Sequence, residues 1–236
     1  MAVFLTFAAL AFLAANFLVA FGYVALRDLA GWPPAPQQGE VSPVFSLLIE
    51  VLFYGLLVGF VYYLVVGYHG RPFRSSLKLR KPSVGETIGY TIGGFLMAVG
   101  VQLAPTLLPD KQDFPLEKML STPLAAYALG SFAILVAPFM EELIFRGIVF
   151  SVLERRVNLV FAIVTTALLF GGLHVPEYLG AWNHVLLIFV VGAIFSLTRG
   201  LTGSLTPSII LHIAYNFSLM AGFFIQTQQF HNFNTP

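Results

Sequence analysis

The stretch PFMEELIFRG, residues 138–147, places two adjacent carboxylates and an arginine inside one of the most apolar regions of the chain. The preceding segment, TPLAAYALGSFAILVA, carries no charge, and the following segment, GIVFSVL, is apolar again. Ionisable groups in such surroundings are costly and usually functional. The stretch therefore predicts a membrane-spanning helix that carries a functional group of polar side chains.

The composition of the whole chain indicates the same environment. Of its 236 residues, 58% are hydrophobic and only 10% are charged, whereas a soluble domain carries roughly a quarter of charged residues. We therefore expect an integral membrane protein. The net charge of +1 gives no indication of a nucleic-acid partner, and the absence of cysteine excludes disulfides and thiolate metal sites.

Seven segments are long and apolar enough to be membrane helices, which need about 20 residues each. They lie at about 2–26, 43–68, 85–108, from 122 through the opening stretch, 158–174, 183–197 and 203–225. The predicted fold is an all-α, polytopic transmembrane bundle of about seven helices. Glycines at positions 89, 93, 94 and 100 of the third helix predict a close helix–helix approach.

We divide this single membrane domain into three parts. These are N-terminal transmembrane helices and loops at 1–121, a core at 122–225 and a polar tail at 226–236. The loop GRPFRSSLKLRKPS holds five of the twelve Lys and Arg residues, and cytoplasmic loops are rich in such residues. Alternation of the helices then predicts a cytoplasmic N-terminus and an external C-terminus. A Pro-rich loop, RDLAGWPPAPQQGEVSP, separates the first two helices.

The two carboxylates of the opening stretch are not equivalent. Glu142 and Arg146 are four residues apart, so their side chains meet on one helix face, where they would form a structural ion pair. Glu141 points about 100° away and has no obvious partner on its own helix. A carboxylate in an apolar site takes up a proton or finds a distant partner, and either state suits general acid–base chemistry.

Three further polar residues belong to later helices. His174 ends the fifth apolar run one turn after Phe170, while His212 and Asn216 share a face of the last helix. A packing or capping role for His174, and helix–helix hydrogen bonds for the other two, are the simpler alternatives. However, a chain reversal at RRVN, residues 155–158, would bring Glu141 and His174 to equal depth, and His212 could reach the same level.

A carboxylate, two histidines and an amide at one level have two main chemical uses. A glutamate and a histidine can activate water, while a histidine and an amide stabilise an oxyanion. Alternatively, Glu141, His174 and His212 could bind zinc and leave one position for water. Both arrangements hydrolyse acyl bonds, and the sequence contains neither HExxH nor GxSxG.

Three motifs in order resemble a known family. EELIFRG resembles the EExxxR motif of the CPBP family, FGGLH its FxxxH motif and HIAYN its HxxxN motif. That family includes type II CAAX prenyl endopeptidases and bacterial Abi proteins linked to bacteriocin processing and immunity. The resemblance covers about residues 122–220, and its specificity comes from the order of the motifs on successive helices.

The resemblance implies an intramembrane endopeptidase that acts on membrane-associated peptide or protein substrates in a bacterial or archaeal cell membrane. By motif match, Glu141 is the catalytic base, His174 helps to activate the water, and His212 and Asn216 form the oxyanion site. Glu142, Arg146 and Phe170 would support them. We expect no cofactor, with zinc as the alternative.

A catalytically idle Abi-type immunity or partner-binding protein is the alternative function. A transporter with a proton relay would more often show paired repeats and broken helices in both halves, and the sequence shows none.

Overall fold

A computed structural model describes residues 2–30, 43–107 and 115–233 of the chain. Every regular element within these ranges is helical, which confirms the predicted all-α class. Most of the predicted Pro-rich loop, residues 31–42, and the last three residues of the predicted tail lie outside the described residues. The helices group into two compact units, residues 1–72 and 73–236.

The first unit is a helical hairpin. It contains α1 (Ala2–Ala30), α2 (Pro43–Tyr62) and a π-helical turn, η1 (Tyr63–Tyr68). The rings of Phe7 and Phe60 stack with their centroids 3.8 Å apart, and Tyr23 meets Phe45 edge to face at 5.0 Å. Because early residues of α1 pair with late residues of α2, the two helices run antiparallel.

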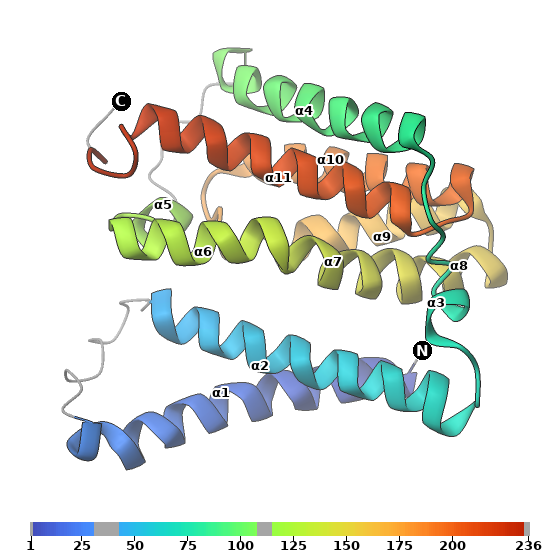
Figure 1. Cartoon of the computed structure of the whole chain (residues 1–236), viewed down its shortest axis with the longest axis horizontal. Helices are drawn as coiled ribbons and strands as arrows, with labels where there is room; N and C mark the ends of the chain where they lie inside the picture. The colour runs from blue at the N-terminus through green and yellow to red at the C-terminus, as the bar shows by residue number, and fades with distance from the viewer. Residues whose placement is uncertain (1, 31–42, 108–114, 234–236) are drawn as a thin grey trace. The chain divides into compact units, whose positions relative to one another are not determined.

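The second unit holds all three motifs. It contains α3 (Phe73–Ser76), α4 (Val84–Leu107), α5 (Pro115–Met119), α6 (Pro123–Leu135), α7 (Ala137–Glu142), the π-helical turn η2 (Leu143–Val149), α8 (Phe150–Arg156), α9 (Leu159–Leu173), α10 (Trp182–Thr202) and α11 (Thr206–Gln226). Figure 1 shows α4 lying along α11, while α9 packs on α10 and α7 packs on α11.

The helices fit a membrane environment. Among the described residues, six helical segments are long and apolar enough to cross a bilayer, and α9 is a seventh, shorter apolar helix. Large apolar side chains stay exposed on these helices, for example Leu135 at 72% and Leu201 at 73%. Such exposure is unfavourable in water but normal toward lipid. The protein is an integral membrane protein, and the predicted bundle of about seven helices is confirmed.

Close packing by glycine occurs at two of the four predicted positions in α4. A β-carbon on Gly94 would lie 2.5 Å from the carbonyl oxygen of Leu211, and one on Gly93 would lie 3.1 Å from the same leucine's side chain. Gly89 and Gly100 have no such neighbour within 4 Å. The approach at Gly93 and Gly94 fixes the turn of α11 that carries His212.

The fourth predicted helix is interrupted rather than continuous. Its regular pairing breaks at Val136, where φ is −112° and ψ is −54°. Pro138 explains the break, since proline has no N–H to donate to the preceding turn. A new helix, α9, begins directly after the turn predicted at residues 155–158. Asn158 caps it by accepting a hydrogen bond from the Phe161 N–H at 2.8 Å.

Candidate active site

The buried centre of the candidate site is Arg146. It is fully buried and donates three hydrogen bonds, from Nη1 to Glu142 Oε1 at 2.9 Å, from Nη2 to the Gly192 carbonyl at 2.7 Å and from Nε to Ser196 Oγ at 3.3 Å. The predicted pair with Glu142 is therefore present. The two acceptors on α10 were not predicted. Together they fix the guanidinium on both of its edges.

Aromatic rings cover the faces of this guanidinium. Its central carbon lies 4.6 Å from the ring centroid of Phe170 and 5.3 Å from that of Phe195. Phe170 also meets Phe145 edge to face at 5.2 Å, which joins α9 to η2. The phenylalanine of the second motif thus holds the arginine of the first motif by packing and cation–π attraction.

Gly192 leaves no room for a side chain at this place. A β-carbon there would lie 2.9 Å from Phe170 Cδ1 and 3.4 Å from Arg146 Nη2. Distances below about 3 Å force the neighbours to move, so glycine is required for α10 to approach both residues.

His212 lies between the two carboxylates. Its Nδ1 is 3.1 Å from Glu142 Oε1, and its Nε2 is 3.7 Å from Glu141 Oε2. The imidazole stacks on Phe195 at 4.4 Å. Because an ionised carboxylate only accepts hydrogen bonds, Nδ1 donates to Glu142, and Nε2 faces Glu141. The 3.7 Å spacing is too long for a direct hydrogen bond, but one water molecule can contact both atoms.

The two glutamates differ in access. The side chain of Glu142 is fully buried, whereas that of Glu141 is 16% exposed. Glu142 therefore serves Arg146 and His212 from inside the bundle. Glu141 is the carboxylate that an incoming molecule can reach.

His174 is the C-terminal cap residue of α9, as the sequence suggested. Its Nδ1 lies 2.8 Å from the Phe170 carbonyl oxygen. A carbonyl only accepts, so Nδ1 carries the proton and Nε2 of the neutral ring is left as an acceptor. The half-buried ring lies beside Phe170, with the centroids 4.6 Å apart.

Asn216 forms the helix–helix hydrogen bond that was the simpler alternative. Its Nδ2 donates to the Ala133 carbonyl of α6 at 2.7 Å, close to the break at Val136. This bond uses one of two amide N–H groups. The predicted oxyanion role of Asn216 stays a prediction.

Glu177 is a further acidic neighbour that the sequence analysis did not select. It follows His174 in the connection between α9 and α10, and its N–H donates to the His174 carbonyl at 3.1 Å. Its carboxyl interacts electrostatically with His174 and Glu141, and burial raises its pKa. A carboxylate three residues after a motif histidine, in the apolar context HVPEY, was the available signal.

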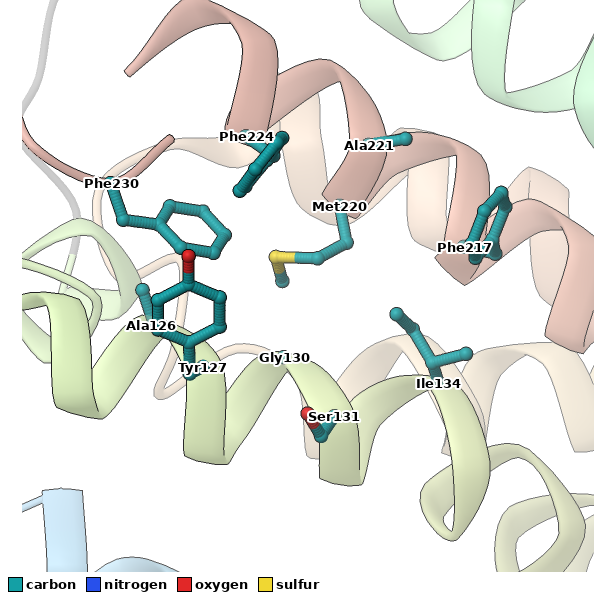
Figure 2. Close-up of a pocket in the computed structure, with 10 residues that line it drawn as sticks. All are labelled: Ala126, Tyr127, Gly130, Ser131, Ile134, Phe217, Met220, Ala221, Phe224 and Phe230. Carbon is teal, nitrogen blue, oxygen red and sulfur yellow. The ribbon is translucent and has the colours of Figure 1, made fainter. Parts of the chain in front are cut away.

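An apolar cavity of about 270 Å³ is lined mainly by residues of α6 and α11. Figure 2 shows Met220 pointing into it from α11, with Tyr127 and Phe230 at one end and Ile134 near Phe217 at the other. Its lining residues are Ala126, Tyr127, Gly130, Ser131, Ile134, Phe217, Met220, Ala221, Phe224 and Phe230. Ile134 and Phe217 directly follow Ala133 and Asn216 in the sequence, but none of Glu141, Glu142, His174, His212 and Asn216 lines the cavity.

The arrangement does not match the zinc shell considered from the sequence. Among the described residues, no group of three or more His, Cys, Asp or Glu side chains is placed to hold a metal ion. Glu141, His174 and His212 therefore do not fit a three-ligand site in this conformation.

Comparison with known proteins gives two matches. The model of a family described as "Type II CAAX prenyl endopeptidase Rce1-like" matches residues 123–218, a range that contains all three motifs. A curated protein of Bacillus subtilis (strain 168), named "Putative membrane peptidase YdiL", is 25% identical over 143 residues. That alignment covers 58% of this chain and 57% of the relative. No solved structure matches.

Proposed function

Because residues 123–218 identify this chain as a member of the CPBP family of intramembrane peptidases, we propose that it hydrolyses peptide bonds of membrane-associated peptide or protein substrates. The observation that carries this proposal is the placement of His212 between an accessible carboxylate, Glu141, and a buried one, Glu142. General base catalysis needs a carboxylate that water can reach, beside a group that stabilises the charge formed in the reaction.

In the proposed mechanism, Glu141 takes a proton from water while the water oxygen attacks the carbonyl carbon of the substrate. The tetrahedral intermediate then breaks its C–N bond, and Glu141 returns the proton to the leaving amine. His174 helps to orient the water through Nε2. The oxyanion accepts hydrogen bonds from doubly protonated His212 through Nε2–H and from the second N–H of Asn216.

Glu142 acts through His212 and does not contact the substrate. Its Oε1 accepts hydrogen bonds from both Arg146 Nη1 and His212 Nδ1, so it fixes the ring and supplies the charge that stabilises an imidazolium. The two carboxylates therefore have different roles: Glu141 is the base that contacts water, and Glu142 orients the histidine. The difference in side-chain exposure between Glu141 and Glu142 supports this division.

The test is a cleavage assay with purified protein in lipid vesicles. A set of membrane-spanning and lipid-anchored peptides is incubated with the protein, and the products are identified by mass spectrometry. We expect new C-termini produced by hydrolysis. If no peptide in the set is cut while the folded protein binds one of them, the peptidase proposal fails and the idle, partner-binding alternative replaces it.

The same assay tests the metal-free form of the proposal. After treatment with a strong chelator and elemental analysis, we expect full activity with no bound metal. Loss of activity that stoichiometric zinc restores would replace this mechanism with the zinc-dependent one.

A further inference from the structure

The π-helical turn η2 lies between the glutamates and α8, and it changes the pattern of backbone hydrogen bonds there. The N–H of Phe150 donates to the Phe145 carbonyl, five residues back, instead of four as in an α-helix. When the chain returns to α-helical pairing in α8, one carbonyl is left without an N–H partner. The first carbonyl after that of Phe145 is the carbonyl of Arg146.

A serine hydroxyl contacts that carbonyl. Ser151 Oγ donates to the Arg146 oxygen at 3.2 Å, and Arg199 Nη2 donates to Ser151 Oγ at 3.2 Å. The hydroxyl has a single proton and the guanidinium has no acceptor. Since Arg199 occupies the oxygen of Ser151 as a donor, the hydroxyl proton is directed to the Arg146 carbonyl.

The buried position of Arg199 is unfavourable for a charged side chain. It is only 2% exposed, and its Nε has no hydrogen-bond partner among the described residues. Its guanidinium carbon lies 5.7 Å from the Phe150 ring, and Glu154 is the acidic side chain that interacts with its charge. Burying an arginine costs several kcal/mol unless its contacts compensate. The mechanism above makes no use of this residue.

We propose that Arg199 and Ser151 are positioning residues that hold the π-helical turn in register, so that Arg146 keeps Glu142 against His212. The chain of contacts runs from Arg199 to Ser151, to the Arg146 backbone, and through the Arg146 side chain to Glu142. The catalytic importance of this positioning rests on the proposed peptidase function. The effect on the His212 ring does not depend on that reaction.

The test compares four single variants of the full-length protein. Ser151→Ala removes the hydroxyl, Ser151→Thr keeps it, and Arg199→Lys keeps one donor for it. Ser218→Ala is the matched control, because Ser218 Oγ also donates to a helix carbonyl, that of Ala214 at 2.7 Å, away from η2. The first readout is the pair of ring-nitrogen ¹⁵N shifts of His212, which report its tautomer and hydrogen bonding. A spectrum of His212→Gln assigns them among the five histidines.

We expect Ser151→Ala to move the His212 ring signals, and Ser151→Thr and Ser218→Ala to leave them in place. In the cleavage assay, Ser151→Ala should lower kcat by ~10- to 100-fold with KM unchanged, because small displacements of catalytic groups have such effects. Arg199→Lys should fall between Ser151→Ala and wild type in both readouts.

Two results would overturn the inference. One is a Ser151→Ala protein whose His212 signals and kcat equal those of wild type. The other is an equal change in Ser151→Ala and Ser218→Ala, which would show that any lost helix hydrogen bond has this effect. If wild type cleaves no peptide, the proposed function fails, and the ring-nitrogen spectra still decide whether Ser151 positions His212.

Discussion

Replacing Glu142 by Gln removes one charge from a pair that is buried on both sides. Glu142 and Arg146 are each fully buried, and the 2.9 Å bond between them is a charge-assisted one. Glutamine has nearly the same shape and keeps an oxygen that can accept from Arg146 Nη1. The substitution therefore tests the charge of Glu142, with little change in packing.

The expected loss of stability depends on which contacts Arg146 retains in the variant. Removing one partner of a buried ion pair costs about 3–5 kcal/mol. Arg146 retains its bonds to the Gly192 carbonyl and Ser196 Oγ, and the ring of Phe170 still covers it. These contacts place the expected cost near the lower limit, about 3 kcal/mol. That cost lowers the folding equilibrium constant by roughly 100-fold.

The assay is reversible unfolding in mixed micelles titrated with SDS. The control is the double variant Glu142→Gln/Arg146→Met, which removes both charges and should recover about 1 kcal/mol or more relative to the single variant. A single variant within about 0.5 kcal/mol of wild type, the range of neutral surface changes, would refute the reasoning. A double variant no more stable than the single one would also contradict it.

Gly192→Ala should destabilise the protein by about 1–3 kcal/mol through its clash with Phe170, whereas Gly172→Ala, with open space around its β-carbon, should be nearly neutral in the same SDS titration. Equal effects would exclude the packing explanation. Burial raises the pKa of the Glu177 carboxyl, so the folded protein favours the protonated form of this group. The stability that the protonated carboxyl contributes is complete below the ordinary pKa of glutamate and is lost as the pH rises through the raised pKa. Thermal denaturation should therefore show Glu177→Gln gaining Tm over wild type as the pH rises above about 4.3, the ordinary pKa of a glutamate, and a pH-independent difference would contradict this. A reporter fused after Leu79 should read cytoplasmic and one at the C-terminus external, and the reverse pattern would overturn the charge-based topology.

The helices could be predicted because membrane helices leave a simple signal. Apolar runs placed the predicted fifth and seventh helices within about three residues of α9 and α11. The pair of Glu142 and Arg146 was predictable because it depends only on helical spacing. The break at Val136 had a visible cause in Pro138, although the π-helical turn after it had no comparable signal.

The contacts between helices could not be derived from spacing. His212 is 70 positions from Glu142, and its contact with both carboxylates depends on how α11 docks against α7. The bond from Asn216 to a backbone carbonyl has no side-chain partner that a pattern could reveal. Gly192 was visible only as one glycine in an apolar run, and its role follows from the ring and the guanidinium that it contacts.

The central claim is that the carboxylate of Glu141 activates the water that cleaves the substrate. Its most direct test is the value of kcat for Glu141→Gln, measured per folded molecule on a peptide that wild type cuts. Glutamine keeps the shape and cannot accept the proton, so we predict normal folding, an unchanged KM and a kcat lower by about 10²- to 10⁴-fold, the usual contribution of a general base. A Glu141→Gln protein that retains wild-type kcat would contradict the account.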